Sequence, residues 1–173
     1  RKYWSKYKAV GFKIFYYHVR KPDYEKVWAY LRDNNVKILH ITRDNMLKTY
    51  VSRLKAGITD EWSKSSQVNE SEKLMFNINP SDLKNDFVKT EEWEMNARKY
   101  FKNSSVLEIK YENLESSTES VMNEVLDFLN VPRYQVVPST YKQRTESVAD
   151  IVENYDELKK YFKGTKWEKF FED

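Results

Sequence analysis

The sequence predicts an α/β protein in which a mainly parallel sheet is flanked by helices in three layers. The first observation is the near-continuous apolar run from Val36 to Ile41, which is typical of a parallel strand covered on both faces. The second is the change of period that follows, because apolar residues recur at helical spacing from Met46 to Ile58. Strands that pass directly into helices indicate parallel strands joined by helical crossovers.

Strand patterns occur at three places, and each is followed by a helical pattern. Apolar, β-branched and aromatic residues predict strands over residues 9–19, 36–42 and 106–110. We expect the strand over 36–42 to be central in the sheet. The predicted helices cover residues 22–33, 46–58, 79–103, 121–129 and 148–162.

Capping residues predict where several of these helices begin and end. Asn79 followed by proline and an early acidic residue is a typical helix start. Ser116 and Glu119 have the spacing of a capping box, as do Thr165 and Glu168. Gly164 is expected to end the helix before it.

Length and composition set the outer limits. A chain of 173 residues can bury one good core, which favours a single domain. Thirty basic and 27 acidic residues nearly balance, so the charge of +3 does not call for nucleic acid. There is no cysteine, which excludes disulfides and thiolate metal sites, and no metal is expected. No apolar run approaches the roughly 20 residues of a membrane span and no signal peptide pattern opens the chain, so we expect a soluble, cytoplasmic protein.

The junction after residues 36–42 is the strongest candidate for a binding site. Arg43 lies at the carboxyl end of the predicted strand, which is where open α/β sheets bind their ligands. A guanidinium group beside the amino end of a helix suits an anion. Asn45 and Ser52, seven residues apart, share the helix face opposite the apolar stripe. The sequence therefore predicts a local anion site at this junction.

The same stretch resembles the 3′-phosphate-binding segment of sulfotransferases that use 3′-phosphoadenosine 5′-phosphosulfate (PAPS), particularly the bacterial Stf0-like branch. In the commoner cytosolic pattern the arginine and serine are eight residues apart, whereas Arg43 and Ser52 are nine apart. The resemblance covers nearly the whole chain. The matching residues are Arg43, Asn45, Leu47, Val51, Ser52 and Ala56, then Gly11-Phe12-Lys13, Tyr111-Glu112-Asn113-Leu114, Phe128-Leu129-Asn130-Val131-Pro132 and Asn154-Tyr155.

The resemblance implies PAPS as donor and assigns roles in binding it. Arg43, with Asn45 and Ser52, corresponds to the residues that hold the 3′-phosphate. Tyr111 corresponds to a tyrosine that lies against the adenine, and the alternative is that its ring only covers the end of the sheet. Lys142 and Arg144 correspond to a loop that closes over the 3′-phosphate, and the alternative is a solvated turn.

The resemblance also points to candidate catalytic residues. Lys13 corresponds to a strand lysine that faces the transferred sulfuryl group, or it snorkels from an edge position to water. His18 has the chemistry of a general base for the acceptor proton. His40, inside the second predicted strand, is interpreted as a satisfied core residue. Trp62 either anchors a loop to the core or belongs to the acceptor region, as in the Stf0-like proteins.

One part of the family pattern is not found. PAPS enzymes bind the 5′-phosphosulfate with a glycine-containing loop after their first strand, and the only glycines here are Gly11, Gly57 and Gly164. We therefore expect residues 1–173 to be one sulfotransferase-like domain that lacks its amino-terminal strand, loop and helix. Two functions remain open. One is sulfuryl transfer from PAPS to a hydroxyl or amine of a small molecule, lipid or carbohydrate, and the other is a non-catalytic nucleotide-binding or interaction module.

Overall fold

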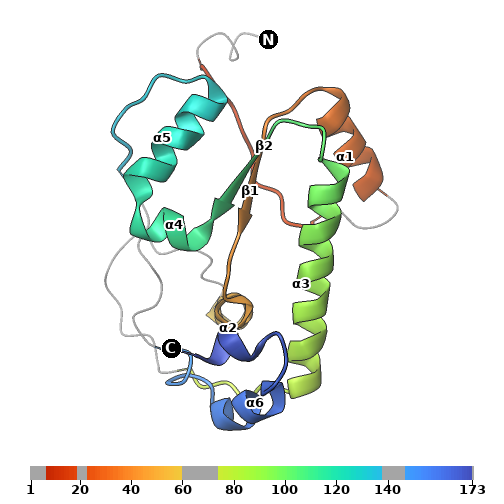
Figure 1. The fold of residues 1–173 in the computed structure, drawn as a ribbon, viewed down its shortest axis with the longest axis vertical. Helices are drawn as coiled ribbons and strands as arrows, with labels where there is room; N and C mark the ends of the chain where they lie inside the picture. The colour runs from red at the N-terminus through yellow and green to blue at the C-terminus, as the bar shows by residue number, and fades with distance from the viewer. Residues whose placement is uncertain (1–6, 19–22, 60–73, 138–146, 173) are drawn as a thin grey trace. The chain divides into compact units, whose positions relative to one another are not determined.

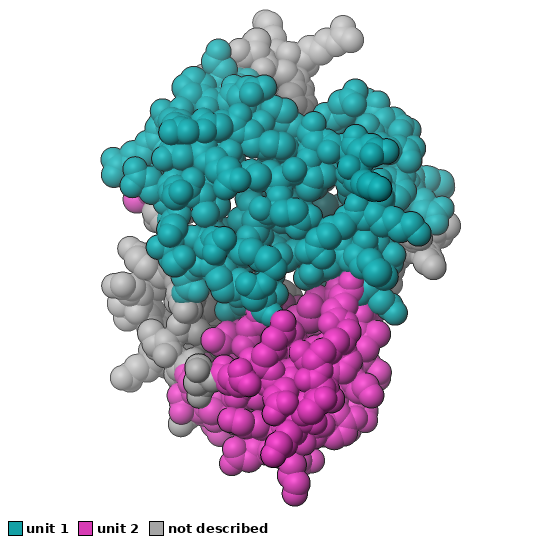
Figure 2. Space-filling model, in the orientation of Figure 1, with its two compact units in different colours: residues 1–44, 92–136 teal, residues 45–91, 137–173 magenta. Residues whose placement is uncertain are grey.

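The computed structural model describes residues 7–18, 23–59, 74–137 and 147–172 (Figure 1). Two compact units divide the chain, one containing residues 1–44 and 92–136 and the other residues 45–91 and 137–173 (Figure 2). The elements in chain order are α1 (Tyr24–Asp33), β1 (Ile38–Thr42), α2 (Met46–Thr59), α3 (Pro80–Tyr100), β2 (Val106–Lys110), α4 (Tyr111–Ser116), α5 (Thr118–Leu129), α6 (Tyr155–Phe162) and the 3₁₀ helix η2 (Glu168–Phe171).

The first unit is built on two parallel strands. β1 and β2 pair so that Ile38 lies opposite Val106 and Thr42 opposite Lys110. Side chains alternate between faces along a strand, so His40 and Glu108, which are register partners, share one face. The α/β class and the parallel pairing confirm the prediction. The described sheet has two strands, so the central position of residues 36–42 stays a prediction.

Helices cover both faces of this sheet within the first unit. Ile109 on one face packs against Val121 and Val125 of α5. Trp28 and Leu31 of α1 line a cavity with Ile38 and other residues of the opposite face. Figure 1 shows α5 and α1 on opposite sides of the two strands. The first unit therefore has the helix, sheet and helix layers expected of the fold.

The second unit has a core of its own that joins distant parts of the sequence. Buried side chains of α2, the first half of α3, α6 and η2 form one apolar cluster. Phe76 forms a parallel bridge with Val152. The Asn154 side chain donates to the Ile78 carbonyl at 2.8 Å and accepts from the Ile78 N–H at 2.9 Å. The largest fully buried side chains of this cluster are Phe87, Phe162, Phe171, Leu47, Leu83, Ile151 and Leu158.

Helix ends follow the capping predictions in part. The Asn79 side-chain oxygen accepts from the backbone N–H of Ser81 at 2.8 Å. The helix α3 begins at Pro80, directly after Asn79, as predicted. Gly164 has a φ of 75° where α6 has ended, which confirms the predicted stop. The capping box at Ser116 is wrong, because the short helix α4 includes Ser116 and α5 begins at Thr118 without a side-chain cap. No pattern in the sequence predicted α4.

The strand predicted over residues 9–19 is wrong over the part that the structure describes. Residues 7–15 contain no paired strand, and residues 16–18 form a turn in which the His18 N–H donates to the Phe15 carbonyl at 3.0 Å. The strand propensity of a residue reflects how well its side chain fits a pleated sheet surface. It does not show whether another strand is available to pair with the segment. Large apolar side chains of this segment, including Val10 and Phe12, are exposed. Three further predicted residues, Trp62, Lys142 and Arg144, lie outside the described residues.

A pair of neighbouring aromatic residues in α6 tests the core of the second unit. Phe162 is 0% exposed, whereas Tyr161 is 47% exposed. Phe162→Ala should destabilise this unit by about 3–5 kcal/mol, because it removes a large ring from a packed core. Tyr161→Ala should cost less than about 1 kcal/mol. Denaturant unfolding followed by tryptophan fluorescence measures both, and equal losses for the two variants would contradict the assigned core.

Candidate functional site

The carboxyl ends of β1 and β2 bring two of the predicted binding residues together. Thr42 and Lys110 are the last register partners of the two strands. The next residues, Arg43 and Tyr111, therefore leave the same edge of the sheet. The Arg43 guanidinium carbon lies 4.6 Å from the centre of the Tyr111 ring. A cation over an aromatic face is attracted by the ring quadrupole, so this contact holds the arginine head in place.

Glu112 connects this arginine to the backbone that leads out of β1. Its two carboxylate oxygens each accept from the Asp44 N–H at 3.2 Å. One of them lies 3.8 Å from the Arg43 Nε atom. The Asp44 carboxylate in turn pairs with the Lys110 ammonium group at 2.5 Å. Charged groups from both strand ends thus fix the turn that carries Arg43.

Arg43 has hydrogen-bonding capacity that the described part of the chain does not use. Its side chain is 22% exposed, and the Nε atom is buried without a hydrogen-bond partner among the described residues. The Thr42 hydroxyl is also buried and without a partner there. A guanidinium stays charged at any ordinary pH, and an unsatisfied buried donor costs about 1–3 kcal/mol. A guanidinium group at this edge of the sheet suits an anion.

The second unit carries the other two predicted 3′-phosphate residues. The Asn45 side-chain oxygen caps α2 by accepting from the Lys48 N–H at 3.0 Å. Its amide nitrogen donates to the Phe170 carbonyl at 3.1 Å, which ties α2 to η2. Asn45 therefore has a structural task in its own unit. Ser52 lies on α2 and is half-buried.

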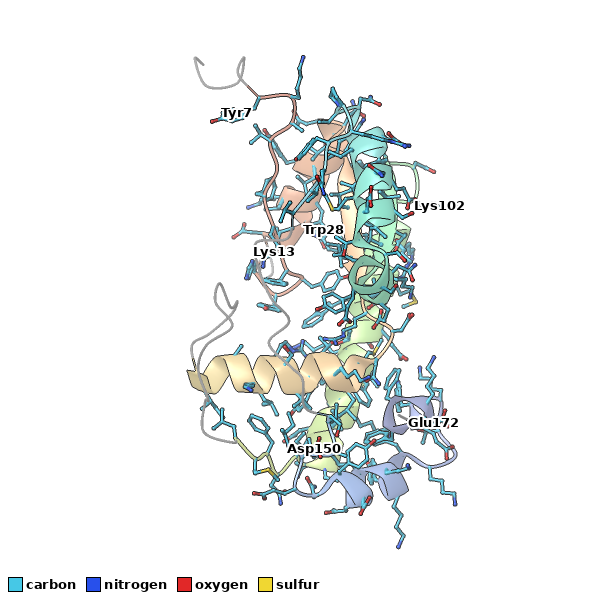
Figure 3. The ribbon with its side chains drawn as sticks, turned by 90° about the vertical axis from the view of Figure 1, so that its left-hand side faces the viewer. Tyr7, Lys13, Trp28, Lys102, Asp150 and Glu172 are labelled. Carbon is cyan, nitrogen blue, oxygen red and sulfur yellow. The ribbon has the colours of Figure 1, made fainter. Side chains whose placement is uncertain are left out.

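The two predicted catalytic residues lie on the segment that does not form a strand. Lys13 is exposed, with its ammonium 4.8 Å from the centre of the Phe15 ring (Figure 3). His18 is exposed, and its Nδ1 atom accepts from the Phe15 N–H at 3.4 Å, which is a long hydrogen bond. Neither residue lines the cavity next to β1. The catalytic assignments of Lys13 and His18 stay predictions.

The structure shows a polar network around His40 that no pattern in the sequence predicted. The His40 Nδ1 atom lies 2.7 Å from a carboxylate oxygen of Glu108, and the Nε2 atom lies 2.5 Å from the Tyr16 hydroxyl. A carboxylate only accepts, so Nδ1 carries a proton, and in the neutral imidazole Nε2 accepts from the Tyr16 hydroxyl. The prediction that His40 is a satisfied buried residue is confirmed, since both ring nitrogens have partners. An available signal was Glu108, a charged residue inside an apolar strand.

Further charged and aromatic groups surround this network. Arg98 pairs with Glu108 at 3.5 Å and with Glu94 at 3.4 Å. The Tyr16 ring stacks on Trp93 with a centroid distance of 5.7 Å. Burial raises the pKa of Tyr16, and the carboxylate of Glu94 adds to this, so its hydroxyl stays protonated and acts as donor. Burial also raises the pKa of Glu94, with Arg98 opposing the shift.

Tyr16, His40 and Glu108 form part of the wall of a cavity of about 320 Å³. The cavity lies along the amino-terminal halves of the strands, because Ile38 and Val106 line it as well. Trp28 and Lys102, which are labelled in Figure 3, also contribute. Within the described ranges no cluster of histidine and acidic residues has the arrangement of a metal site. Likewise, no described helix is long and apolar enough to cross a membrane.

These features define an α/β protein in which Arg43, a candidate anion-binding residue, lies at the carboxyl edge of a parallel sheet. A comparison with protein-family models matches residues 18–171 to the sulfotransferase domain. The chain therefore belongs to the sulfotransferase domain family, which confirms the family that the sequence resembles. No solved structure matches it.

A protein of Rhizobium tropici described as nodulation protein H is 28% identical to this chain over 144 residues. The match covers 82% of this chain and 57% of that protein. The chain thus spans little more than half the length of this relative.

The pKa of Glu94 leads to a pH-dependent prediction for the first unit. Its folded pKa is raised by burial, so the folded protein binds more protons than the unfolded chain at mildly acidic pH. Stability from this group is therefore present below its ordinary pKa and is lost as pH rises through the folded pKa. Glu94→Gln removes the titration, so the melting temperature of the variant minus that of the parent should increase from acid to neutral pH.

Thermal denaturation across that pH range measures the difference directly. Glu119→Gln changes an exposed glutamate of α5 and serves as the matched control. A Glu94→Gln difference that falls as pH rises would contradict the burial of this carboxyl group.

Proposed function

We propose that this protein transfers a sulfuryl group from PAPS to a hydroxyl or amine acceptor. The observation that carries the proposal is the Arg43 guanidinium, which lies over Tyr111 with an unsatisfied buried donor at the carboxyl edge of the sheet. In a chain of the sulfotransferase domain family, an arginine so placed suits the 3′-phosphate of the nucleotide. The acceptor is a small molecule, a lipid or a carbohydrate, and the reaction as proposed needs no metal and no nucleic acid.

In this proposal each described residue has a binding task. The Arg43 fork donates to phosphate oxygens, and the contact with Tyr111 keeps the fork aimed at them. The Tyr111 ring offers its remaining face to the adenine, which an aromatic side chain can stack against. Asn45, Ser52, Lys142 and Arg144 remain in the proposed nucleotide set on the strength of the resemblance.

The proposed transfer is a single displacement at sulfur in which atoms and charge balance. The acceptor oxygen or nitrogen attacks the sulfur in line, the bond from sulfur to the phosphate oxygen breaks, and 3′-phosphoadenosine 5′-phosphate leaves. The acceptor proton passes to a general base, for which His18 is the proposed residue and Lys13 the proposed neighbour of the sulfuryl group. No covalent enzyme intermediate is expected.

We further propose that residues 1–173 belong to a sulfotransferase domain whose 5′-phosphosulfate loop lies in an amino-terminal segment beyond them. The absence of the loop pattern from the sequence and the exposed apolar residues Leu39 and Ile41 of β1 support this proposal. A cytoplasmic location stays a prediction. The non-catalytic alternative has no observation in its favour, and turnover of PAPS by the intact protein separates the two functions.

Replacement of Arg43 tests the nucleotide site. Removing one partner of a desolvated charge pair costs roughly 2–5 kcal/mol, so Arg43→Ala should weaken 3′-phosphoadenosine 5′-phosphate between about 30-fold and several thousand-fold. Ser52→Ala should cost about 1 kcal/mol, the value of a single hydrogen bond. Arg133, an exposed arginine paired with Asp127, is the matched control, and Arg133→Ala should bind like the parent.

Titration calorimetry on the intact protein measures these affinities, with adenosine 5′-phosphate as the second ligand. The parent should prefer the nucleotide that carries the 3′-phosphate. Equal binding of the two nucleotides, or parent-like binding by Arg43→Ala, would remove the main support for the proposed function.

Two substitutions of Glu112 are expected to change the affinity for the nucleotide in opposite directions. Glu112→Gln keeps an acceptor for the Asp44 N–H and removes a negative charge 3.8 Å from Arg43 Nε. A pair of this kind is worth about 0.2–1 kcal/mol, so the nucleotide should bind up to about 5-fold tighter. Glu112→Ala should bind it more weakly than the parent, because the turn that positions Arg43 loses its support. The same titrations measure both variants, and tighter binding by Glu112→Ala would refute the positioning role.

A further inference from the structure

The segment 7–18 carries both residues proposed for the transfer step, Lys13 and His18, and the described structure shows no strand pairing in it. Its internal contacts are local. The His18 N–H donates to the Phe15 carbonyl at 3.0 Å, and the rings of Phe15 and Tyr17 stack with a centroid distance of 5.2 Å. Such contacts shape the turn but do not fix its position relative to β1. That position depends on a contact outside the segment.

Tyr16 makes this contact. It is half-buried, whereas every other residue from 7 to 18 is exposed. Its hydroxyl lies 2.5 Å from His40 Nε2, and among the described residues this is the only hydrogen bond that joins the segment to another part of the chain. The Tyr16 ring stacks on Trp93 with a centroid distance of 5.7 Å and an interplanar angle of 25°. Tyr16 thus links the segment to β1 through its hydroxyl and to Trp93 through its ring.

The sheet holds the His40 acceptor in one orientation. His40 is buried on β1, and its Nδ1–H donates to Glu108, its register partner on β2, at 2.7 Å. Arg98 lies 3.5 Å from the same carboxylate group. In the neutral imidazole the remaining lone pair on Nε2 accepts from the Tyr16 hydroxyl. A buried acceptor without a donor costs free energy, so this arrangement favours the bound position of Tyr16.

The position of Tyr16 limits where its neighbours can lie. Lys13 comes three residues before it and His18 two residues after it. An extended chain spans about 3.3–3.6 Å per residue, so both backbones stay within roughly 10 Å of the anchored one. The hydrogen bond from His18 to Phe15 closes the turn around Tyr16 and restricts His18 further.

We propose that Tyr16 is a positioning residue, which holds the segment that carries Lys13 and His18 in one arrangement against β1 through its hydrogen bond to His40. Tyr16 acts through these neighbours and not on the reactants. Its effect on turnover rests on the proposed sulfuryl transfer, whereas the anchoring of the segment does not.

Distances between two spin labels test the anchoring on the intact protein without any nucleotide. Residues 1–173 contain no cysteine, so labels can be attached at Gly11→Cys in the segment and at Glu124→Cys on α5. A Cβ atom added at Gly11 meets nothing within 4 Å, and Glu124 is exposed. We expect one narrow distance distribution in the parent. In Tyr16→Phe the fraction outside that peak should rise about 2- to 10-fold, which is the effect of one hydrogen bond.

Two further variants separate the hydrogen bond from other effects. Tyr17→Phe is the matched control, because it removes a hydroxyl from the neighbouring exposed tyrosine, and it should leave the distribution unchanged. His40→Phe removes the same hydrogen bond from the other side. The double variant Tyr16→Phe/His40→Phe should therefore broaden the distribution no more than either single variant does. Melting temperatures check that each variant remains folded.

Kinetics with PAPS test the consequence for the transfer step. Loosening the segment that carries the proposed base should lower the kcat of Tyr16→Phe by about 2- to 10-fold. The affinity for 3′-phosphoadenosine 5′-phosphate should be unchanged, because Arg43 is held by Tyr111 and Glu112 instead. Tyr17→Phe should keep the kcat and the affinity of the parent. A merely structural role of Tyr16 would lower the melting temperature without this separation of kcat from affinity.

A broad distance distribution in the parent would overturn the proposal even if Tyr16→Phe does not fold. A parent-like distribution in folded Tyr16→Phe, or a broadened one with a parent-like kcat, would also overturn it. Failure of the proposed function gives a different result, because a protein that does not turn over PAPS still shows in the label distances whether Tyr16 anchors the segment.

Discussion

The parallel register of β1 and β2 is the constraint on which the first unit depends. Since Thr42 lies opposite Lys110, the chain leaves both strands at one edge, and Arg43 comes to lie over Tyr111. The same register sets His40 opposite Glu108, two residues earlier. A one-residue slip of either strand would turn that strand's side chains to the other face and separate both pairs. The pairing of β1 with β2 therefore positions both Arg43 and the buried side chain of His40.

The parts of the fold that follow from local pattern could be predicted from the sequence. The apolar stripe of α2, the Asn79 cap of α3 and the apolar strand at Val106–Lys110 all carry strong periodic or capping signals. The strand expected over 9–19 failed because pairing depends on an edge supplied by another segment, which residue propensity cannot report. The capping box at Ser116 failed because an extra short helix, α4, takes the residues before α5.

Some residues of the candidate site could likewise be predicted from the sequence, and others could not. Arg43 was predictable as a candidate site residue because it directly follows a recognisable strand, whereas Tyr111 became one through its place in a motif that resembles the family pattern. The hydrogen bond between His40 and Tyr16 was not predictable, because it joins β1 to a segment whose path no periodicity reveals. Asn45 shows a different limit, since a polar side chain at a helix start suits a cap as well as a ligand, and here it caps α2.

The bridge between Phe76 and Val152 also has a consequence for the order in which the protein forms during synthesis. Most buried residues of the second unit's core lie in the final stretch, from Val148 to Phe171. That unit cannot complete its core until the segment from Val148 to Phe171 has left the ribosome, whereas the two strands of the first unit are present earlier. Contacts between segments this far apart in sequence slow folding. The nascent chain therefore exposes the apolar face of α2 until that segment emerges, and transiently exposed apolar surface is prone to aggregation.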